Sequence, residues 1–564
     1  MKSIVWRQKL RASDPSPRKT ARTQFSHSTA LVLLQEFFMQ TSNQPPIQDA
    51  RMFQDSLYRS HRSTAVAGMA LVDDFSKMFP NLPSFEDGQN TGDLLQRLQQ
   101  LARKGGPMDA LDPTVTITNP LGGNDADRNP NNQNPDMTVG FTFLGQFLDH
   151  DITFDPAALK DPPTSPNLRT PFFDLDSVYG RGPDQDRVLY DRTSELDRPT
   201  AARFLIDFDA VRDLPRTSQQ RAITADPRND ENVIISQLHL AFLKFHNRVT
   251  DQVEAEMTTA AVAAGLPLPP PGAVFEEALK RVRWHYQWII VWQFLPATLD
   301  KDVYNQVRND RPTLFLPSAR PKIPREFQVA AYRFGHSQVR PGYKVNVGFG
   351  APIFDARIDP REGDPNDLRG GRRAPRRFVE WDTFFNFGTQ EINPDTGAVR
   401  AKVKQNKRID PFLSTPLFDL PVGPGLPSPA DDVRTLAGRN LERHIQHHLA
   451  SGQDIAAALG YPALQTADFP ADVQALGFDV STPLWYYILL EAWRQPGRPP
   501  QQQGQRLGLV GSRIVAEVFL SLLLSDPDSY LSRQPEWTPT LPQRDGRVTG
   551  SFTMTDLLTF AGVA

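Results

Sequence analysis

The sequence predicts a mainly α-helical protein in which long ordered loops join the helices. Several stretches carry apolar residues at the three- and four-residue spacing of a helix. The clearest are residues 93–101, 228–245, 275–295 and 482–524. Fifty-one prolines and 35 glycines are spread along the chain without a repeat, which favours ordered loops over a low-complexity protein.

Each stretch predicts a separate element. We expect residues 93–101 to form a core helix at the start of the folded part, and residues 107–137, rich in Pro, Gly, Asn and Asp, to form a loop. Residues 275–295 predict one long helix that Pro296 ends. Residues 482–524 predict two more buried helices.

The composition limits the classes of partner and of metal site. With 62 basic and 65 acidic residues, the chain lacks the charge excess through which proteins bind nucleic acids or membrane surfaces. It has no cysteine, so any metal centre must use histidine, carboxylate or carbonyl ligands. No apolar run approaches the roughly 18 residues of a membrane-spanning helix. Small molecules are therefore the expected partners.

The segment 141–154 (FTFLGQFLDHDITF) places charged residues in an apolar surrounding. It has almost no polar face, so it should be buried, and burial makes Asp149, His150 and Asp151 costly unless each finds a partner. On a helix, Gln146 and His150 share one face while the two acids point elsewhere. The structural alternative is a hydrogen-bonded core histidine flanked by helix-end acids.

A short acidic loop offers the ligands of a hard cation. Alternate positions supply a hydroxyl, a carbonyl and two carboxylates, which are oxygen ligands that calcium prefers. These positions are Thr170, Phe172, Asp174 and Asp176. Asp151 could complete the shell. A solvated acidic turn is the alternative for this loop taken alone.

Three further groups of residues admit a structural and a functional interpretation. Arg228 and Glu231, three apart, could form a simple intrahelical ion pair. Arg333 and His336 are three apart in an apolar segment, and a buried arginine beside a buried histidine needs an anion or a ligand. Three histidines have helical spacing for a metal, but no carboxylate or cysteine clusters beside them, so we expect a solvated helix face. They are His444, His447 and His448.

Five motifs in this order resemble those of the peroxidase–cyclooxygenase superfamily, the animal-type haem peroxidases. They are Gln146-x-x-Asp149-His150-Asp151, Thr170-x-Phe172-x-Asp174-x-Asp176-x-x-Tyr179-Gly180, Arg228-x-x-Glu231, Tyr332-Arg333-x-Gly335-His336 and Asn440-x-x-Arg443. The resemblance covers about residues 60–560 and is nearest to the bacterial members. It implies a haem peroxidase fold, a single large helical domain with little β structure and with haem between the central helices.

The resemblance implies two histidines on opposite sides of a haem b derivative. His336 matches the proximal ligand of the haem iron, whose other ring nitrogen donates to the side-chain oxygen of Asn440. His150 matches the distal histidine, which takes a proton from hydrogen peroxide and returns it to the leaving oxygen. Arg228 would stabilise the negative charge that develops in this step. Gln146 matches a distal amide that holds water or a halide.

The same resemblance implies how both cofactors are held. Asp149 and Glu231 match carboxylates that form ester bonds to haem methyl groups. Arg333 and Arg443 are expected to pair with the haem propionates. A structural calcium ion, which would hold the distal histidine in place, is expected on five residues. They are Asp151, Thr170, Phe172, Asp174 and Asp176.

The implied function is that of an oxidoreductase, a haem peroxidase that reduces hydrogen peroxide and oxidises halides, thiocyanate or small phenolic donors. Asn232 stands where myeloperoxidase-like members carry a methionine linked to haem, which argues against chloride. The nearest alternative is a fatty-acid dioxygenase of the same superfamily, but Arg333 occupies the position of its tyrosine. A second alternative is a non-catalytic haem- or calcium-binding protein, which the presence of His150 and Arg228 disfavours.

The N-terminal residues differ from the rest of the chain. Residues 1–50 combine basic side chains with serine and proline, and their apolar patch at 30–34 is too short for an ordinary signal peptide. We expect a disordered arm over 1–50 and an animal-type haem peroxidase domain over 51–564. Calcium use would suit the cell exterior, whereas the absence of cysteines suits the cytosol equally well. The sequence predicts no oligomeric state.

Overall fold

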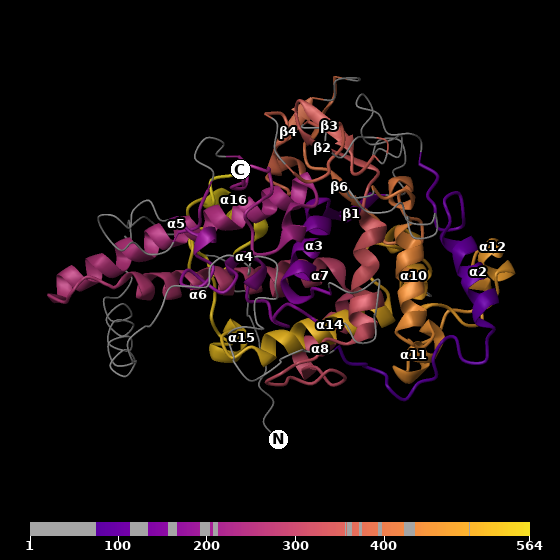
Figure 1. Cartoon of the computed structure of the whole chain (residues 1–564). Coiled ribbons are helices and arrows are strands. Elements are labelled where there is room, and N and C mark those ends of the chain that lie inside the picture. The colour runs from indigo at the N-terminus through magenta and orange to yellow at the C-terminus, as the bar shows by residue number, and fades with distance from the viewer. Residues whose placement is uncertain are drawn as a thin grey trace, which may run out of the picture.

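A computed structural model describes the chain at residues 75–112, 133–155, 166–191, 203–206, 212–355, 357, 364–371, 375–392, 397–421, 435–495 and 497–564. The expected N-terminal arm, residues 1–50, lies outside these ranges. Within them, helices dominate, and the strands form three two-stranded antiparallel sheets (Figure 1). The mainly helical fold with little β structure is thereby confirmed.

The elements of the described ranges follow in chain order. The α-helices are α2 (Thr91–Ala102), α3 (Gly140–Ile152), α4 (Asp176–Tyr179), α5 (Val233–Ala264), α6 (Pro271–Ile289), α7 (Leu295–Thr298), α8 (Lys301–Asp310), α10 (Leu436–Gln446), α11 (Gly452–Ala458), α12 (Ala471–Ala475), α13 (Leu484–Arg494), α14 (Leu509–Ser525), α15 (Tyr530–Arg533) and α16 (Met554–Phe560). The strands pair as β1 (Gln133–Thr138) with β6 (Gln405–Lys407), β2 (Gly342–Asn346) with β3 (Phe349–Pro352), and β4 (Gln390–Ile392) with β5 (Val399–Ala401).

Shorter helical turns connect these elements. The 3₁₀ turns are η4 (Arg187–Leu189), η6 (Pro227–Asp230), η9 (Ala331–Gln338), η10 (Trp381–Thr383), η11 (Thr415–Phe418), η12 (Thr466–Asp468) and η13 (Pro500–Gln502). The π-helical turns are η7 (Ile290–Phe294) and η8 (Glu326–Ala330). None of the helices in the described ranges is both long and apolar enough to cross a membrane.

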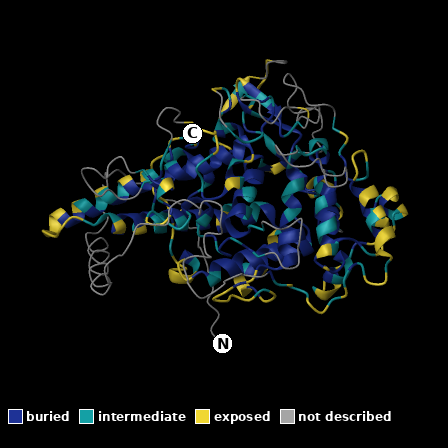
Figure 2. Cartoon of the chain, in the orientation of Figure 1, coloured by how far each residue is buried: buried dark blue, intermediate teal, exposed yellow. Residues whose placement is uncertain are grey.

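Helix α3 lies at the centre of the molecule, in contact with α5 and η9 (Figure 1). Its Phe147 ring stacks on Phe242 of α5 with centroids 4.6 Å apart and meets Tyr286 of α6 edge-on at 6.4 Å. Burying one such phenylalanine contributes about 1.5–3 kcal/mol. The apolar character of α3 explains its place, since buried residues concentrate in the central helices (Figure 2).

Helix α5 is the longest helix described, with 32 residues. The Asn232 side chain caps its first turn by accepting from the Ile235 N–H at 2.9 Å, and Gly265 ends it in the left-handed region at φ +64°. It lies beside α6, and the pair extends away from the other helices toward the left of Figure 1. The predicted helical stretch 228–245 therefore begins at Val233.

The prediction that Pro296 ends the second long helix is wrong. Helix α6 leads through the π-turn η7 into α7, which contains Pro296 and ends at Thr298. A π-turn shifts the backbone pairing from i+4 to i+5, and Pro296 falls in the first turn of α7. Proline has no N–H to donate to the Val291 carbonyl five residues earlier, and the Tyr304 hydroxyl donates to that carbonyl instead, at 2.5 Å.

Of the other predicted elements, the helices are confirmed and one predicted loop is partly wrong. Residues 93–101 form a helix, and 482–524 hold the buried helices α13 and α14. Residues 133–137, expected to be loop, belong to strand β1 because they pair with the distant strand β6. Local composition carries no signal for such a pairing.

The three histidines of the C-terminal part do not form a solvated face. His444 and His447 are buried, at 0% and 3% exposed, because α10 packs against α2 and η8. His444 meets Phe85 edge-on at 5.2 Å, and Arg325 donates to Nδ1 of His447 at 2.6 Å. Only His448 of the three is exposed, so the expected solvated face is wrong.

Candidate active site

The C-terminal half of α3 brings His150 into contact with Arg228 of η6. His150 is buried, and its backbone oxygen accepts from Nη2 of Arg228 at 3.0 Å. The same guanidinium is held by the Asp226 carboxylate, at 2.8 Å from Nη2 and 3.1 Å from Nε. The structural alternative, a simple Arg228–Glu231 ion pair, does not form, because Asp226 caps this turn and binds the guanidinium instead.

The environment of His150 keeps its ring neutral. Burial, reinforced by the Arg228 charge, lowers the pKa of His150 to about 4. At neutral pH the imidazole therefore has one ring nitrogen able to accept a proton. Asn229 lies against the other nitrogen, Nδ1, at 2.8 Å. Sequence reasoning missed Asn229, although its position beside Arg228 in a turn could have drawn attention to it.

Gln146 and Glu231 are joined across α3 and η6. Nε2 of Gln146 donates to the Glu231 carboxylate, and its Oε1 accepts from Nδ2 of Asn232 at 3.2 Å. Desolvation by the surrounding protein raises the pKa of Glu231 to about 7, although the residue is exposed. The two predicted residues therefore meet at an accessible position between α3 and η6.

Asp149 acts electrostatically on both predicted haem-side histidines. Its negative charge raises the pKa of His150 and of His336 against the larger effect of burial. Its Oδ1 accepts from the Thr153 hydroxyl at 3.0 Å. His150 and His336, distant in sequence, therefore both lie within the electrostatic range of one carboxylate.

His336 lies on η9 and contacts α10. Burial, followed by the Arg333 charge, lowers the pKa of His336 to about 3, which leaves the neutral imidazole that binds metals. Asn440 of α10 lies 2.8 Å from Nδ1 of His336. The predicted pair is present, but the amide Nδ2 faces the ring, whereas the prediction places the oxygen there. A 180° rotation of the amide exchanges the two atoms.

Arg333 and Arg443 form a cationic pair near His336. Three residues make one turn of a 3₁₀-helix, so Arg333 shares a face of η9 with His336. Burial, followed by the Arg333 charge, lowers the pKa of Arg443 to about 10, and its buried Nε has no hydrogen-bond partner. Nε of Arg333 donates to the Gln328 carbonyl at 2.9 Å. Neither guanidinium pairs with a carboxylate of the described residues.

These residues fit a haem. Two neighbouring cations with no anionic partner in the described ranges suit its two propionates. A Cβ added to Gly335, next to His336, would meet no atom within 4 Å, so there is open space on this side. His336 and Asn440 provide the ligand with its hydrogen-bond partner.

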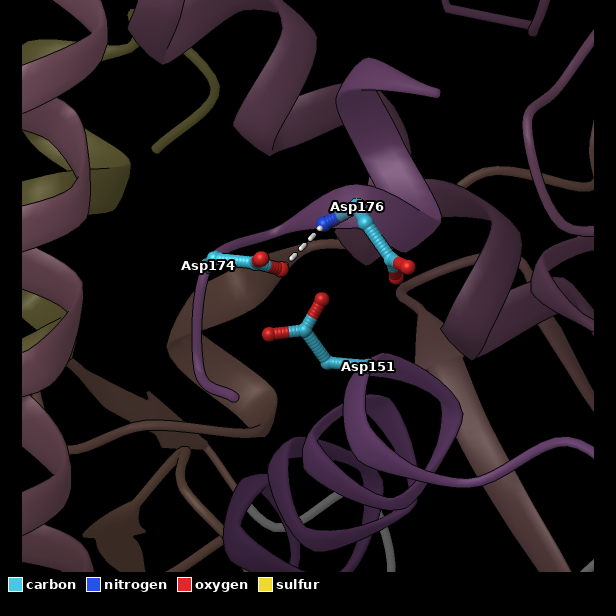
Figure 3. Close-up of side chains that lie close together, drawn as sticks. All are labelled: Asp151, Asp174 and Asp176. Atoms are coloured by element: carbon cyan, nitrogen blue, oxygen red, sulfur yellow. Dashed lines mark hydrogen bonds between the residues drawn. The ribbon is translucent and has the colours of Figure 1, made fainter. Parts of the chain in front are cut away.

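A second cluster contains the predicted calcium ligands. Asp151 projects from α3 toward Asp174 and Asp176, whose carboxylates lie around the same small space (Figure 3). Ligand oxygens of the three lie within 4.8 Å of one another. Burial raises the pKa of Asp151 well above its usual range, and the charges of Asp174 and Asp176 add to the effect. A divalent cation would relieve this repulsion.

The loop that carries these acids is tied together by hydrogen bonds. The hydroxyl of Thr170 donates to Asp174 at 2.8 Å, and its N–H donates to Asp176 at 3.0 Å. Phe172 lies between them and is half-buried. Leu175 has φ +64°, a left-handed conformation that costs an L-residue about 1–2 kcal/mol, and its N–H donates to Asp151 at 3.1 Å.

Sequence reasoning missed two residues at this cluster. The hydroxyls of Ser177 and Tyr286 donate to Asp151 at 3.2 and 3.0 Å. Ser177 directly follows Asp176 and could have been found from that position. Tyr286 comes from α6, 135 residues away, and no local signal marks it.

Two surface clefts lie apart from these clusters. One, of about 490 Å³, is lined by residues of α2 and α10 such as Leu98 and Leu441. The other, of about 580 Å³, is lined by residues such as Lys244, Trp381 and Val563. Neither is lined by a predicted site residue.

Comparisons with known proteins relate the chain to haem peroxidases. The sequence profile described as "Animal haem peroxidase" matches residues 156–348. A peroxidase-like protein of Margaritifera margaritifera is 29% identical over 317 residues, which cover 51% of this chain and 35% of that protein. Human (Homo sapiens) thyroid peroxidase is 25% identical over 343 residues, which cover 58% of this chain and 33% of that protein. The matches thus span about a third of the length of these relatives.

A solved structure shares the fold. Peroxidase A from Dictyostelium discoideum aligns with a TM-score of 0.50 at 16% sequence identity, and the alignment covers 86% of this chain and 92% of that chain. At this level of identity the likeness concerns the fold alone.

Proposed function

The chain belongs to the animal haem peroxidase family, and from this membership we propose that it is an enzyme that reduces hydrogen peroxide and oxidises halides, thiocyanate or small phenolic donors. One observation carries the proposal. A neutral, buried His150 lies against the cation Arg228, and the exposed Glu231 follows on the same turn. A proton acceptor beside a fixed positive charge is the pair that peroxide reduction needs.

Each residue has a defined task in this proposal. His336 would hold the haem iron, and Arg333 and Arg443 would bind the propionates. When bound, haem supplies the redox-active iron that passes electrons from the donor to peroxide. His150 takes the proton from one peroxide oxygen and returns it to the other. Arg228 stabilises the negative charge on the leaving oxygen.

The proposal is tested by incubating the purified holoenzyme with two substrate sets. With hydrogen peroxide and bromide, iodide, thiocyanate or a phenol, we expect donor oxidation that depends on peroxide. With linoleate and oxygen, we expect no lipid hydroperoxide. Lipid hydroperoxide without peroxidatic turnover would identify a dioxygenase, and turnover in neither set would identify a non-catalytic binding protein.

The surroundings of His336 favour the peroxidase. Arg333 shares its face of η9, whereas Tyr332 is one residue off and points elsewhere. The Tyr332 hydroxyl donates to the backbone oxygen of Gly145 on α3 at 3.1 Å. The position three residues before His336, where the dioxygenases are expected to carry a tyrosine, is Arg333 in this chain.

We further propose that haem is esterified to Asp149 and Glu231. The carboxylate of Glu231 is exposed and accepts from Gln146, one helical turn before His150, so it can lie against the cofactor. Acid–butanone extraction of the purified holoenzyme is expected to leave haem on the protein. The double variant Asp149→Asn, Glu231→Gln should release it, and each single variant should retain it through one bond. Complete extraction from the unaltered protein would contradict the ester links.

We also propose that Asp151, Asp174 and Asp176 hold a calcium ion together with Thr170 and Phe172. At a free calcium concentration of 100 times Kd, the ion would stabilise the folded protein by about 2.7 kcal/mol. Calorimetry should therefore show that EGTA lowers the unfolding temperature and that calcium, but not magnesium, restores it. Asp174→Asn should remove this response. An unfolding transition indifferent to EGTA in the unaltered protein would contradict the calcium site.

A further inference from the structure

Asn229 lies between two buried histidines. Its Oδ1 is 2.8 Å from Nδ1 of His150, and its Nδ2 is 3.0 Å from Nδ1 of His239 on α5. The same Nδ2 donates to the backbone oxygen of Ser177 at 3.3 Å. All four residues are between 0% and 4% exposed, so water does not compete for these contacts.

The carbonyl of Ser177 decides which way the Asn229 amide points. The two histidine contacts leave the direction open, because an imidazole nitrogen can donate or accept. A backbone carbonyl oxygen only accepts, so the amide atom that faces Ser177 must be the nitrogen. The reversed amide would bring two oxygens together at this position. Oδ1 of Asn229 therefore faces His150.

This direction fixes the tautomer of His150. Because Oδ1 only accepts, Nδ1 of His150 must carry the ring proton. The other nitrogen, Nε2, is then unprotonated and points away from Asn229 on the opposite side of the ring. The alternative tautomer would have its proton on Nε2 and could not accept one from a substrate there.

We propose that Asn229 is a positioning residue that fixes His150 in the tautomer with a free Nε2, and that the Ser177 carbonyl sets the direction of the Asn229 amide. The inference rests on the proposed peroxidase function. Ser177 also donates its hydroxyl to Asp151 at 3.2 Å. Two hydrogen-bonded residues thus join the acidic loop of Asp151, Asp174 and Asp176 to the proton-transfer group.

The test compares Asn229→Ala with Asn229→Asp in the holoenzyme. Stopped-flow spectroscopy measures the reaction with peroxide and, separately, the reaction of the oxidised enzyme with the donor. Proton transfer by a positioned base contributes about 10²- to 10⁴-fold, so Asn229→Ala should slow the peroxide step by about tenfold or more. The donor step should stay within about twofold. Asn229→Asp keeps an oxygen toward Nδ1 but places its second oxygen against the Ser177 carbonyl, so it should recover only part of the rate.

A matched control separates this role from a loss of stability. Asn346 is also a buried asparagine, and its amide donates to the Arg376 and Phe378 carbonyls at 2.8 Å each. Asn346→Ala should lose stability in the same way and yet keep the peroxide step within about twofold of the unaltered protein.

A spectroscopic measurement tests the tautomer without turnover. Nitrogen-15 NMR of histidine-labelled holoenzyme, in the diamagnetic ferrous carbon monoxide form, should show His150 protonated at Nδ1. The His150 signal is assigned by its absence from His150→Gln. A proton on Nε2 in the unaltered protein would overturn the proposal even if Asn229→Ala did not fold. A peroxide step unaffected by Asn229→Ala would also overturn it, whereas an unaltered holoenzyme inert to peroxide would refute the proposed function itself.

Discussion

Replacing His150 by alanine is expected to slow the reaction with hydrogen peroxide by about 10²- to 10⁴-fold while haem stays bound. His150 is buried and neutral, with a pKa lowered to about 4, so it can take a proton at neutral pH. The neighbouring Arg228 cannot replace it, because a guanidinium stays protonated. Haem should remain, because the residue expected to hold the iron is His336.

The measurement is the second-order rate constant with peroxide, followed by the haem absorption band in a stopped-flow instrument. His285→Gln serves as the control, since His285 is equally buried but contacts Arg281, Thr540 and Leu541 outside the site. The control should react within about twofold of the unaltered protein. An unchanged rate in His150→Ala would show that His150 does not act as the proton acceptor.

Replacing Arg228 by leucine is expected to slow the same step by about 10²- to 10³-fold, as does the loss of one donor from a preorganised anion site. The cation is fixed in place by Asp226 and by the His150 backbone oxygen. Asp226 stays ionised because Arg228 and Arg169 hold its pKa well below the usual range, despite burial. The positive charge of Arg228 is therefore fixed in position before peroxide binds.

Arg228→Lys separates the charge from the guanidinium geometry. Lysine keeps the positive charge but lacks the planar fork that holds Asp226, so its rate should lie between those of Arg228→Leu and the unaltered protein. We expect both variants to fold, because Asp226 keeps its ion pair with Arg169 at 2.7 Å. Circular dichroism checks this expectation. If Arg228→Leu reacts with peroxide as fast as the unaltered protein, the assigned electrostatic role is wrong.

Apolar patterning predicts the central part of the fold well. Segment 141–154 has almost no polar face, and α3 accordingly lies buried at the centre of the molecule. The buried helices α13 and α14 follow from the same kind of pattern. The alternate oxygen ligands from Thr170 to Asp176 predict the acidic cluster, since the structure gathers Asp174 and Asp176 around Asp151.

Local sequence patterns do not predict contacts between distant segments. Spacing suggests that Arg228 pairs with Glu231, whereas tertiary structure gives Arg228 to Asp226 and Glu231 to Gln146, 85 residues away. His444 is buried because α2 covers α10. The Asn440–His336 contact spans 104 residues and was expected from the family resemblance, since no spacing rule joins the two residues.

Small polar residues next to recognised motifs are the other group that sequence reasoning missed. Asn229 and Ser177 adjoin Arg228 and Asp176, yet asparagine and serine are common in turns and gave no reason to single them out. Their importance comes from burial and from the direction of each donor and acceptor, which only the folded structure supplies.

A crystal structure of the haem-loaded protein tests the central claim most directly. The account predicts an iron bonded to Nε2 of His336 on one face of the porphyrin, with His150 over the opposite face and not bonded to the metal. An iron bonded to another residue, or the two imidazoles on the same side of the porphyrin, would contradict it.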